Sequence, residues 1–97
     1  MSTPPNSDEF YEKLKTQLQE TTTWPSEYLY KFIIKTDVHK IAILEAIFDN
    51  MGAVINTTGS KNGNYTSISI NLLMKDPDAV IEKYLEVTEK VDGVISL

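Results

Sequence analysis

The chain contains no cysteine and no arginine, and all nine of its basic residues are lysine. Without cysteine it can form no disulfide, no thiolate nucleophile and no cysteine-ligated metal site. Without arginine it lacks the planar donor group that binds phosphate most often, and fourteen acidic residues bring the net charge to −5. Phosphate backbones are bound by basic surfaces, so nucleic acid is an unfavoured partner.

The chain also lacks a long apolar run and has few side chains of the kinds that form catalytic or metal sites. No apolar run approaches the roughly 20 residues that a membrane-spanning helix needs, and the N-terminus has no secretory signal pattern, so we expect a cytoplasmic protein without a membrane partner. His39 is the only histidine, and with no cysteine no cysteine–histidine triad and no histidine-rich metal site can form around it, so we expect a surface residue. The acidic residues between 76 and 92 recur at helical spacing, which is typical of a solvated helix face. We therefore predict no enzyme activity, no catalytic residue, no metal and no cofactor.

Length and composition indicate one small globular domain. The chain has 97 residues, of which 41% are hydrophobic and 24% charged, which is ordinary for a globular protein with one modest core. Residues 1–7 contain Pro4-Pro5 and no apolar side chain that could dock beyond Met1, so they predict a disordered tail. Residues 8–97 then form a single domain.

The domain is predicted to begin with an extra N-terminal helix over residues 8–20. Phe10, Leu14 and Leu18 recur every four residues and form one apolar stripe, and Ser7 is a suitable N-cap. A helix of about a dozen residues is marginally stable alone in water, so it needs the rest of the domain or a partner to pack against.

The remaining residues, 26–97, alternate between strand and helix patterns. We expect strands over 28–34, 53–60, 65–74 and 94–97, and helices over 37–51 and 77–91. Asp37 and Asp76 are the expected N-caps of the helices, and Gly52 is the expected C′ residue of the first. The order βαββαβ predicts an α+β, ferredoxin-like sandwich with a four-stranded antiparallel sheet and two helices on one face, with the first and third strands central.

The hairpin between the second and third strands predicts which side chains meet the helices. Asn62-Gly63 favours a two-residue type I′ turn, because that turn needs positive φ at both positions. The resulting register places Ile55 opposite Ile70 toward the helix-covered core, with Thr57 on the same face. On the other face, polar pairs such as Asn56 with Ser69 follow.

The outer face of the sheet is therefore expected to stay uncovered by the two helices. The first strand leaves Lys31 outward, beside Ser67 and Ser69 of the third strand. The other residues expected on this face are Glu27, Leu29, Ile33, Lys35, Asn56, Thr58, Asn71 and Val94. It is either a solvated face, as antiparallel sheets often have, or a docking surface for a second copy, for the N-terminal helix or for a ligand. Leu29 and Ile33 form a small apolar patch that favours the second interpretation.

Three segments resemble a known family: Trp24-Pro25, the strand around Tyr30-Lys31, and the run from Ser60 to Ile70. They are similar to the bacterial YbeD-like family of unknown function, over roughly residues 10–97. The resemblance implies a βαββαβ fold similar to ACT regulatory domains and no established catalytic residues. The positions that match the family motif, which we take as candidate binding residues, are Lys31, Ser60, Lys61, Tyr65, Ser67 and Ser69.

Three functional hypotheses follow. The first is a small non-enzymatic binding or regulatory module that docks a protein partner or a second copy through its open sheet face or its N-terminal helix. The alternative is an ACT-type sensing domain that binds an amino acid or another small acidic ligand beside Lys31 and Ser67, although the loop 36–40 has no glycine for a close backbone approach. A minor alternative is an RNA-binding domain of the RRM type, which usually needs more aromatic side chains than Tyr65 on this face.

Overall fold

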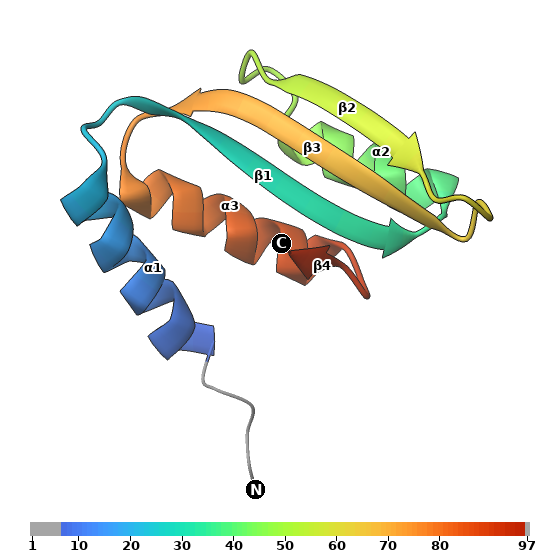
Figure 1. Ribbon diagram of the computed structural model, residues 1–97, viewed down its shortest axis with the longest axis horizontal. Coiled ribbons are helices and arrows are strands. Elements are labelled where there is room, and N and C mark those ends of the chain that lie inside the picture. The colour runs from blue at the N-terminus through green and yellow to red at the C-terminus, as the bar shows by residue number, and fades with distance from the viewer. Residues whose placement is uncertain (1–6, 97) are drawn as a thin grey trace, which may run out of the picture.

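The structure is a computed structural model that describes residues 7–96 (Figure 1). It is an α+β protein with a four-stranded antiparallel sheet and three helices. The elements in chain order are α1 (Ser7–Thr21), β1 (Ser26–Lys35), α2 (Val38–Ile47), β2 (Val54–Gly59), β3 (Tyr65–Met74), α3 (Pro77–Lys90) and β4 (Ile95–Ser96). Most of the disordered tail expected over residues 1–7 lies outside the described residues. Ser7, the expected N-cap, is instead the first helical residue of α1.

The strand order is β2-β3-β1-β4, so β1 and β3 occupy the centre of the sheet. These two strands pair along ten residues each, from Ser26 opposite Met74 to Lys35 opposite Tyr65. The helices α2 and α3 contact each other and lie on the same side of the sheet (Figure 1). The N-cap of each helix is the aspartate that the sequence predicts: Asp37 before α2 and Asp76 before α3.

The hydrophobic core lies between the sheet and these two helices. Along the central strands β1 and β3, buried residues alternate with more exposed ones, because successive side chains in a strand point to opposite faces. The largest fully buried side chains are Tyr30, Phe32, Phe48, Ile34, Leu44, Ile68, Ile70, Val80, Val87 and Val91. Aromatic rings form its centre: Tyr30 lies 4.8 Å from Tyr84 and 5.0 Å from Phe48, measured between ring centroids.

The first core helix ends earlier than expected. α2 stops at Ile47 with Phe48 as its C-cap, so Gly52 is not the C′ residue. Asn50 already has a positive φ of 65°, and Gly52, with φ of 70°, belongs to the turn that follows. The early end is stabilised from another element: the Lys83 ammonium donates to the Ile47 carbonyl at 2.8 Å, and this carbonyl would otherwise lack a helical partner.

The β2–β3 hairpin has the expected register but not the expected turn. Among the described residues only Gly63 of the pair Asn62-Gly63 has a positive φ, 74°, so the type I′ turn is wrong. The Gly63 N–H donates to the Ser60 carbonyl at 2.9 Å, and the Ser60 N–H donates to the Tyr65 carbonyl at 2.7 Å. The loop therefore spans Lys61–Asn64. A loop two residues longer, centred on the same point, leaves the strand register unchanged.

The β2–β3 register itself is confirmed, with Ile55 opposite Ile70 on the core side. Two details on the edge strands are wrong. Thr57 lies on the core side but is exposed, because β2 is an edge strand. Ile95, rather than Val94, lies on the outer face: β4 pairs Ile95 with Ile33, and Val94 packs partly against the core.

The N-terminal helix does not cover the outer face of the sheet. α1 packs against α3, on the helix side of the molecule (Figure 1). The Lys15 ammonium forms an ion pair with Asp78 at 2.8 Å, and the ring of Tyr11 stacks on Tyr84 with centroids 6.0 Å apart. Of the apolar stripe of α1, Leu14 and Leu18 pack partly against the core, whereas Phe10 is 59% exposed. Within residues 7–96, no helix lies over the outer sheet face.

Candidate functional site

The uncovered outer face of the sheet, with the hairpin at its end, contains all six candidate binding residues. Lys31 of β1 lies directly opposite Ser69 of β3, and Ser69 lies opposite Asn56 of β2. The neighbouring row joins Ile33 to Ser67. Residues opposite each other in antiparallel strands have Cβ atoms about 5 Å apart, so Lys31, Ser67 and Ser69 form one cluster at the centre of the face. We call this the Lys31 cluster.

The other three candidates lie at the hairpin end and are separate from this cluster. The Ser60 hydroxyl accepts a hydrogen bond from the Tyr65 N–H at 3.1 Å, so it stabilises the turn. Lys61 is exposed within the turn, and Tyr65 is opposite Lys35. The six candidates therefore divide into a central group and a terminal group on the same side of the sheet.

A polar hollow at the hairpin end includes residues that were not among the candidates. It is lined by Lys35, Thr36, Gly63, Asn64 and Tyr65. The Thr36 N–H donates to the Asn64 carbonyl at 3.0 Å and its hydroxyl lies 2.9 Å from that of Thr66, so the β1–α2 loop is tied to the start of β3. Of the six candidates only Tyr65 lines the hollow. The other four lining residues were not among the candidates, because the β1–α2 loop and the β2–β3 hairpin meet through the β1–β3 register, which no local motif encodes.

The lysines differ in their surroundings according to the face they occupy. On the helix side, Lys15 pairs with Asp78, and Lys83 and Lys90 both pair with Glu86. On the sheet side, the ammonium groups of Lys31, Lys35 and Lys61 make no hydrogen bond and no ion pair with any residue from 9 to 96. Glu27 is the only acidic side chain on the outer strand positions. The outer face is therefore locally basic in a chain whose net charge is −5.

Exposed apolar side chains accompany these lysines. Leu29, Val54, Leu73 and Ile95 all lie on the outer face and are between 46% and 64% exposed. Scattered exposed apolar residues are common, but several on one uncovered sheet face are typical of an interaction surface. The outer face thus combines apolar contact area with unpaired positive charge.

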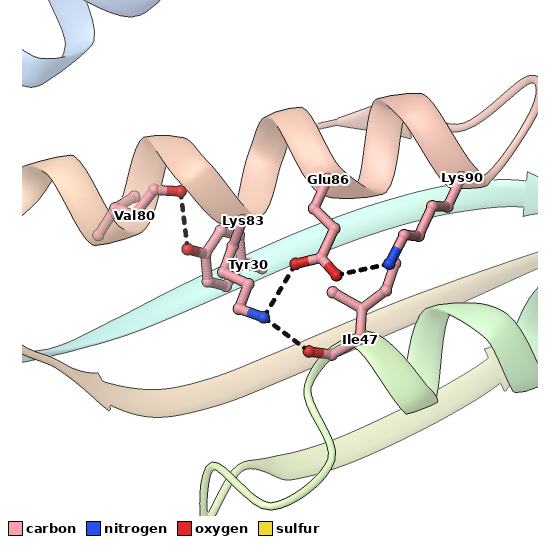
Figure 2. Close-up of polar contacts among 6 residues, drawn as sticks. All are labelled: Tyr30, Ile47, Val80, Lys83, Glu86 and Lys90. Carbon is pink, nitrogen blue, oxygen red and sulfur yellow. Dashed lines mark hydrogen bonds and ion pairs between the residues drawn. The ribbon is translucent and has the colours of Figure 1, made fainter.

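The helix side contains a lysine–glutamate network instead (Figure 2). The two oxygens of Glu86 accept from Lys83 at 3.0 Å and from Lys90 at 2.9 Å. Hydrogen bonds from Lys90 and Lys83 hold the pKa of the Glu86 carboxyl below its usual range. Because Lys83 also binds the Ile47 carbonyl, the network joins α3 to the end of α2. Its groups satisfy one another, which indicates a structural role.

The described residues contain no cluster of side chains that could hold a metal ion. From residue 7 to residue 96, no three histidine, aspartate or glutamate side chains gather as metal ligands would. None of the helices in this range has the length and apolarity to cross a bilayer. His39 is exposed at the start of α2, as expected for a surface residue, and its backbone N–H donates to the Asp37 side chain at 2.9 Å.

Comparisons of the chain with protein-family models, with curated proteins and with solved structures find no match. The resemblance to the YbeD-like family therefore stays a hypothesis that rests on the motif residues alone.

Proposed function

We propose that this protein is a small non-enzymatic binding module whose outer sheet face docks an acidic protein partner. The proposal includes a ferredoxin-like architecture of the ACT type. It is supported by the order βαββαβ that follows α1 and by the central position of β1 and β3. In this arrangement the helices occupy one face and leave the other face free for a partner.

The observation that carries the proposal is the contrast between paired and unpaired lysines. Carboxylates of a partner would meet Lys31, Lys35 and Lys61 without first breaking an ion pair within residues 7–96. Complementary charge increases association rates and disfavours wrong partners. Leu29 and Ile95 would supply apolar contact area beside the charges. A second copy docked sheet to sheet would instead bring two locally basic faces together, which is unfavourable.

The test is affinity capture from the native cell with the wild-type protein, Lys31→Glu and Lys13→Glu as baits. Lys13 is exposed on α1, so its substitution changes the net charge by the same amount at a distance from the sheet. We expect Lys31→Glu to lose acidic partners that both the wild type and Lys13→Glu retain, and raised salt to weaken their capture. If all three baits capture the same proteins, the outer face is not the docking surface.

A second candidate function is the binding of a small carboxylate or amino acid in the hollow at the hairpin end. Lys35 supplies one unpaired positive charge, and Thr36, Asn64 and Tyr65 supply polar groups around it. The test is a thermal-shift screen of amino acids and carboxylates at millimolar concentration, with Lys35→Gln as the variant. A stabilising ligand should lose its effect in that variant, and the absence of any shift in the wild type contradicts the proposal.

An RNA-binding role of the RRM type has less support. Such domains stack bases on aromatic side chains of the outer face. Tyr65 is the only aromatic residue on the outer strand positions of the described sheet, and it lies at the hairpin end. The Lys31 cluster offers hydroxyl and ammonium groups but no ring for stacking.

A further inference from the structure

A second concave site lies on the helix side, and its lining is aromatic, whereas the outer sheet face is basic. It is an aromatic recess lined by Phe10, Tyr11, Leu14, Tyr28, Tyr84 and Ser96. These residues come from α1, β1, α3 and β4, so four elements converge on it. We propose that this recess binds a small, single-ring aromatic molecule that has a hydroxyl or carbonyl group.

The size of the recess fits one aromatic ring. Its volume is about 170 Å³. An apolar cavity of roughly 150 Å³ in another protein stays dry and takes up benzene. A substituted single ring therefore fits the recess, whereas a nucleotide or a cofactor with two fused ring systems does not.

The rings that line the recess pair with one another and so have fixed orientations. Tyr11 and Tyr84 stack with an interplanar angle of 30°, and Tyr28 meets Tyr84 edge to face at 88°. Their centroids are 6.0 and 6.1 Å apart, within the range of favourable aromatic pairs. Phe10 is 59% exposed at the rim, so a ligand would also remove apolar surface from water.

The tyrosine hydroxyls of the recess supply a hydrogen-bond donor for a ligand. The hydroxyl oxygens of Tyr28 and Tyr84 lie 2.8 Å apart, and either can be the donor. One of their two hydrogens serves this bond, and the other has no acceptor among residues 7–96. Burial raises the pKa of Tyr84, so its hydroxyl stays protonated near neutral pH. A ligand oxygen would accept the spare hydrogen, which is why we specify a hydroxyl or carbonyl substituent.

The experiment is a titration of the full-length, isotope-labelled protein with p-cresol, followed by NMR. We expect saturable shifts at Leu14, Tyr28 and Tyr84, and nuclear Overhauser contacts from the cresol ring protons to the Leu14 methyl groups. The saturated analogue 4-methylcyclohexanol should bind roughly ten-fold more weakly, because it forms no aromatic pairs. Shifts that never saturate, contacts that arise elsewhere, or equal affinity for the saturated analogue overturn the proposal.

Two matched variants distinguish binding in the recess from nonspecific binding elsewhere on the protein. Leu14→Trp places a large ring in the recess, whereas Gln17→Trp adds the same ring on an exposed position of α1. We expect Leu14→Trp to abolish p-cresol binding and Gln17→Trp to bind as the wild type does. Binding that survives in a folded Leu14→Trp protein contradicts the site. If that variant unfolds, the contacts measured on the wild type decide the question alone.

Discussion

Tyr30→Phe removes a single buried hydroxyl from the contact between β1 and α3 (Figure 2). Tyr30 is 0% exposed, and its hydroxyl donates to the Val80 carbonyl at 2.9 Å. Phenylalanine keeps the ring and its packing against Phe48 and Tyr84. The substitution therefore isolates one hydrogen bond that links the central strand to the helix above it.

The expected loss in the free energy of unfolding comes mainly from the hydrogen bond. A neutral buried hydrogen bond contributes a net stability of about 1 kcal/mol, with a range of roughly 0.5–1.5 kcal/mol. Loss of the hydroxyl also leaves a small gap beside Val80, which adds to the cost without exceeding this order. For a domain of this size, about 1 kcal/mol corresponds to a decrease in Tm of roughly 4–8 °C.

The assay is urea unfolding followed by circular dichroism, with Tyr65→Phe as the matched control. Tyr65 is 44% exposed on the outer face, so its hydroxyl is solvated and its removal should change the free energy of unfolding by less than about 0.5 kcal/mol. The m-value should stay constant, because neither change alters the surface exposed on unfolding. A Tyr30→Phe protein as stable as the wild type, or a Tyr65→Phe protein equally destabilised, would show that the Tyr30–Val80 hydrogen bond does not stabilise the fold.

Three further predictions concern pH and helix capping. Burial raises the pKa values of Tyr30 and Tyr84 above those of the unfolded chain. Their contribution to the free energy of unfolding is therefore complete below about pH 10 and decreases as the pH rises above it. In urea unfolding, Tyr84→Phe should make this decrease smaller. Lys90 and Lys83 lower the pKa of Glu86, so the stability that Glu86 contributes is present above about pH 4.3 and is lost as the pH falls through the lowered value. Glu86→Gln should therefore lose less stability in acid than the wild type does. If stability depends on pH identically in both proteins, the role of the network is contradicted. Asp76→Ala should cost about 1 kcal/mol in thermal unfolding, because the Asp76 side chain accepts from the Ala79 N–H at 2.8 Å, and an unchanged Tm argues against this cap.

The β2–β3 hairpin was predicted in part. The position of Asn62-Gly63 between β2 and β3 predicted the register correctly, although the turn type was wrong. Register depends on the period of two and on the point about which the loop is centred. The conformation of Asn62 is a local detail that several loops of the same centre can satisfy, so the dipeptide alone did not decide it.

The candidate site was predicted in part. Lys31, Ser67 and Ser69 lie together on the outer face because strand parity is visible in the sequence. The hollow around Lys35 and Asn64 was not predicted, because it forms where two loops that are distant in the chain meet. The aromatic recess was missed for the same reason, since its side chains come from four elements.

Helix and strand periods and capping groups act over a few neighbouring residues, so they predicted the elements, the caps at Asp37 and Asp76, and the faces of β1, β2 and β3. The end of α2 and the surface that α1 covers became visible in the folded chain alone. Those outcomes depend on Lys83 reaching the Ile47 carbonyl and on Tyr11 finding Tyr84, contacts between residues 36 or more positions apart that no local pattern specifies.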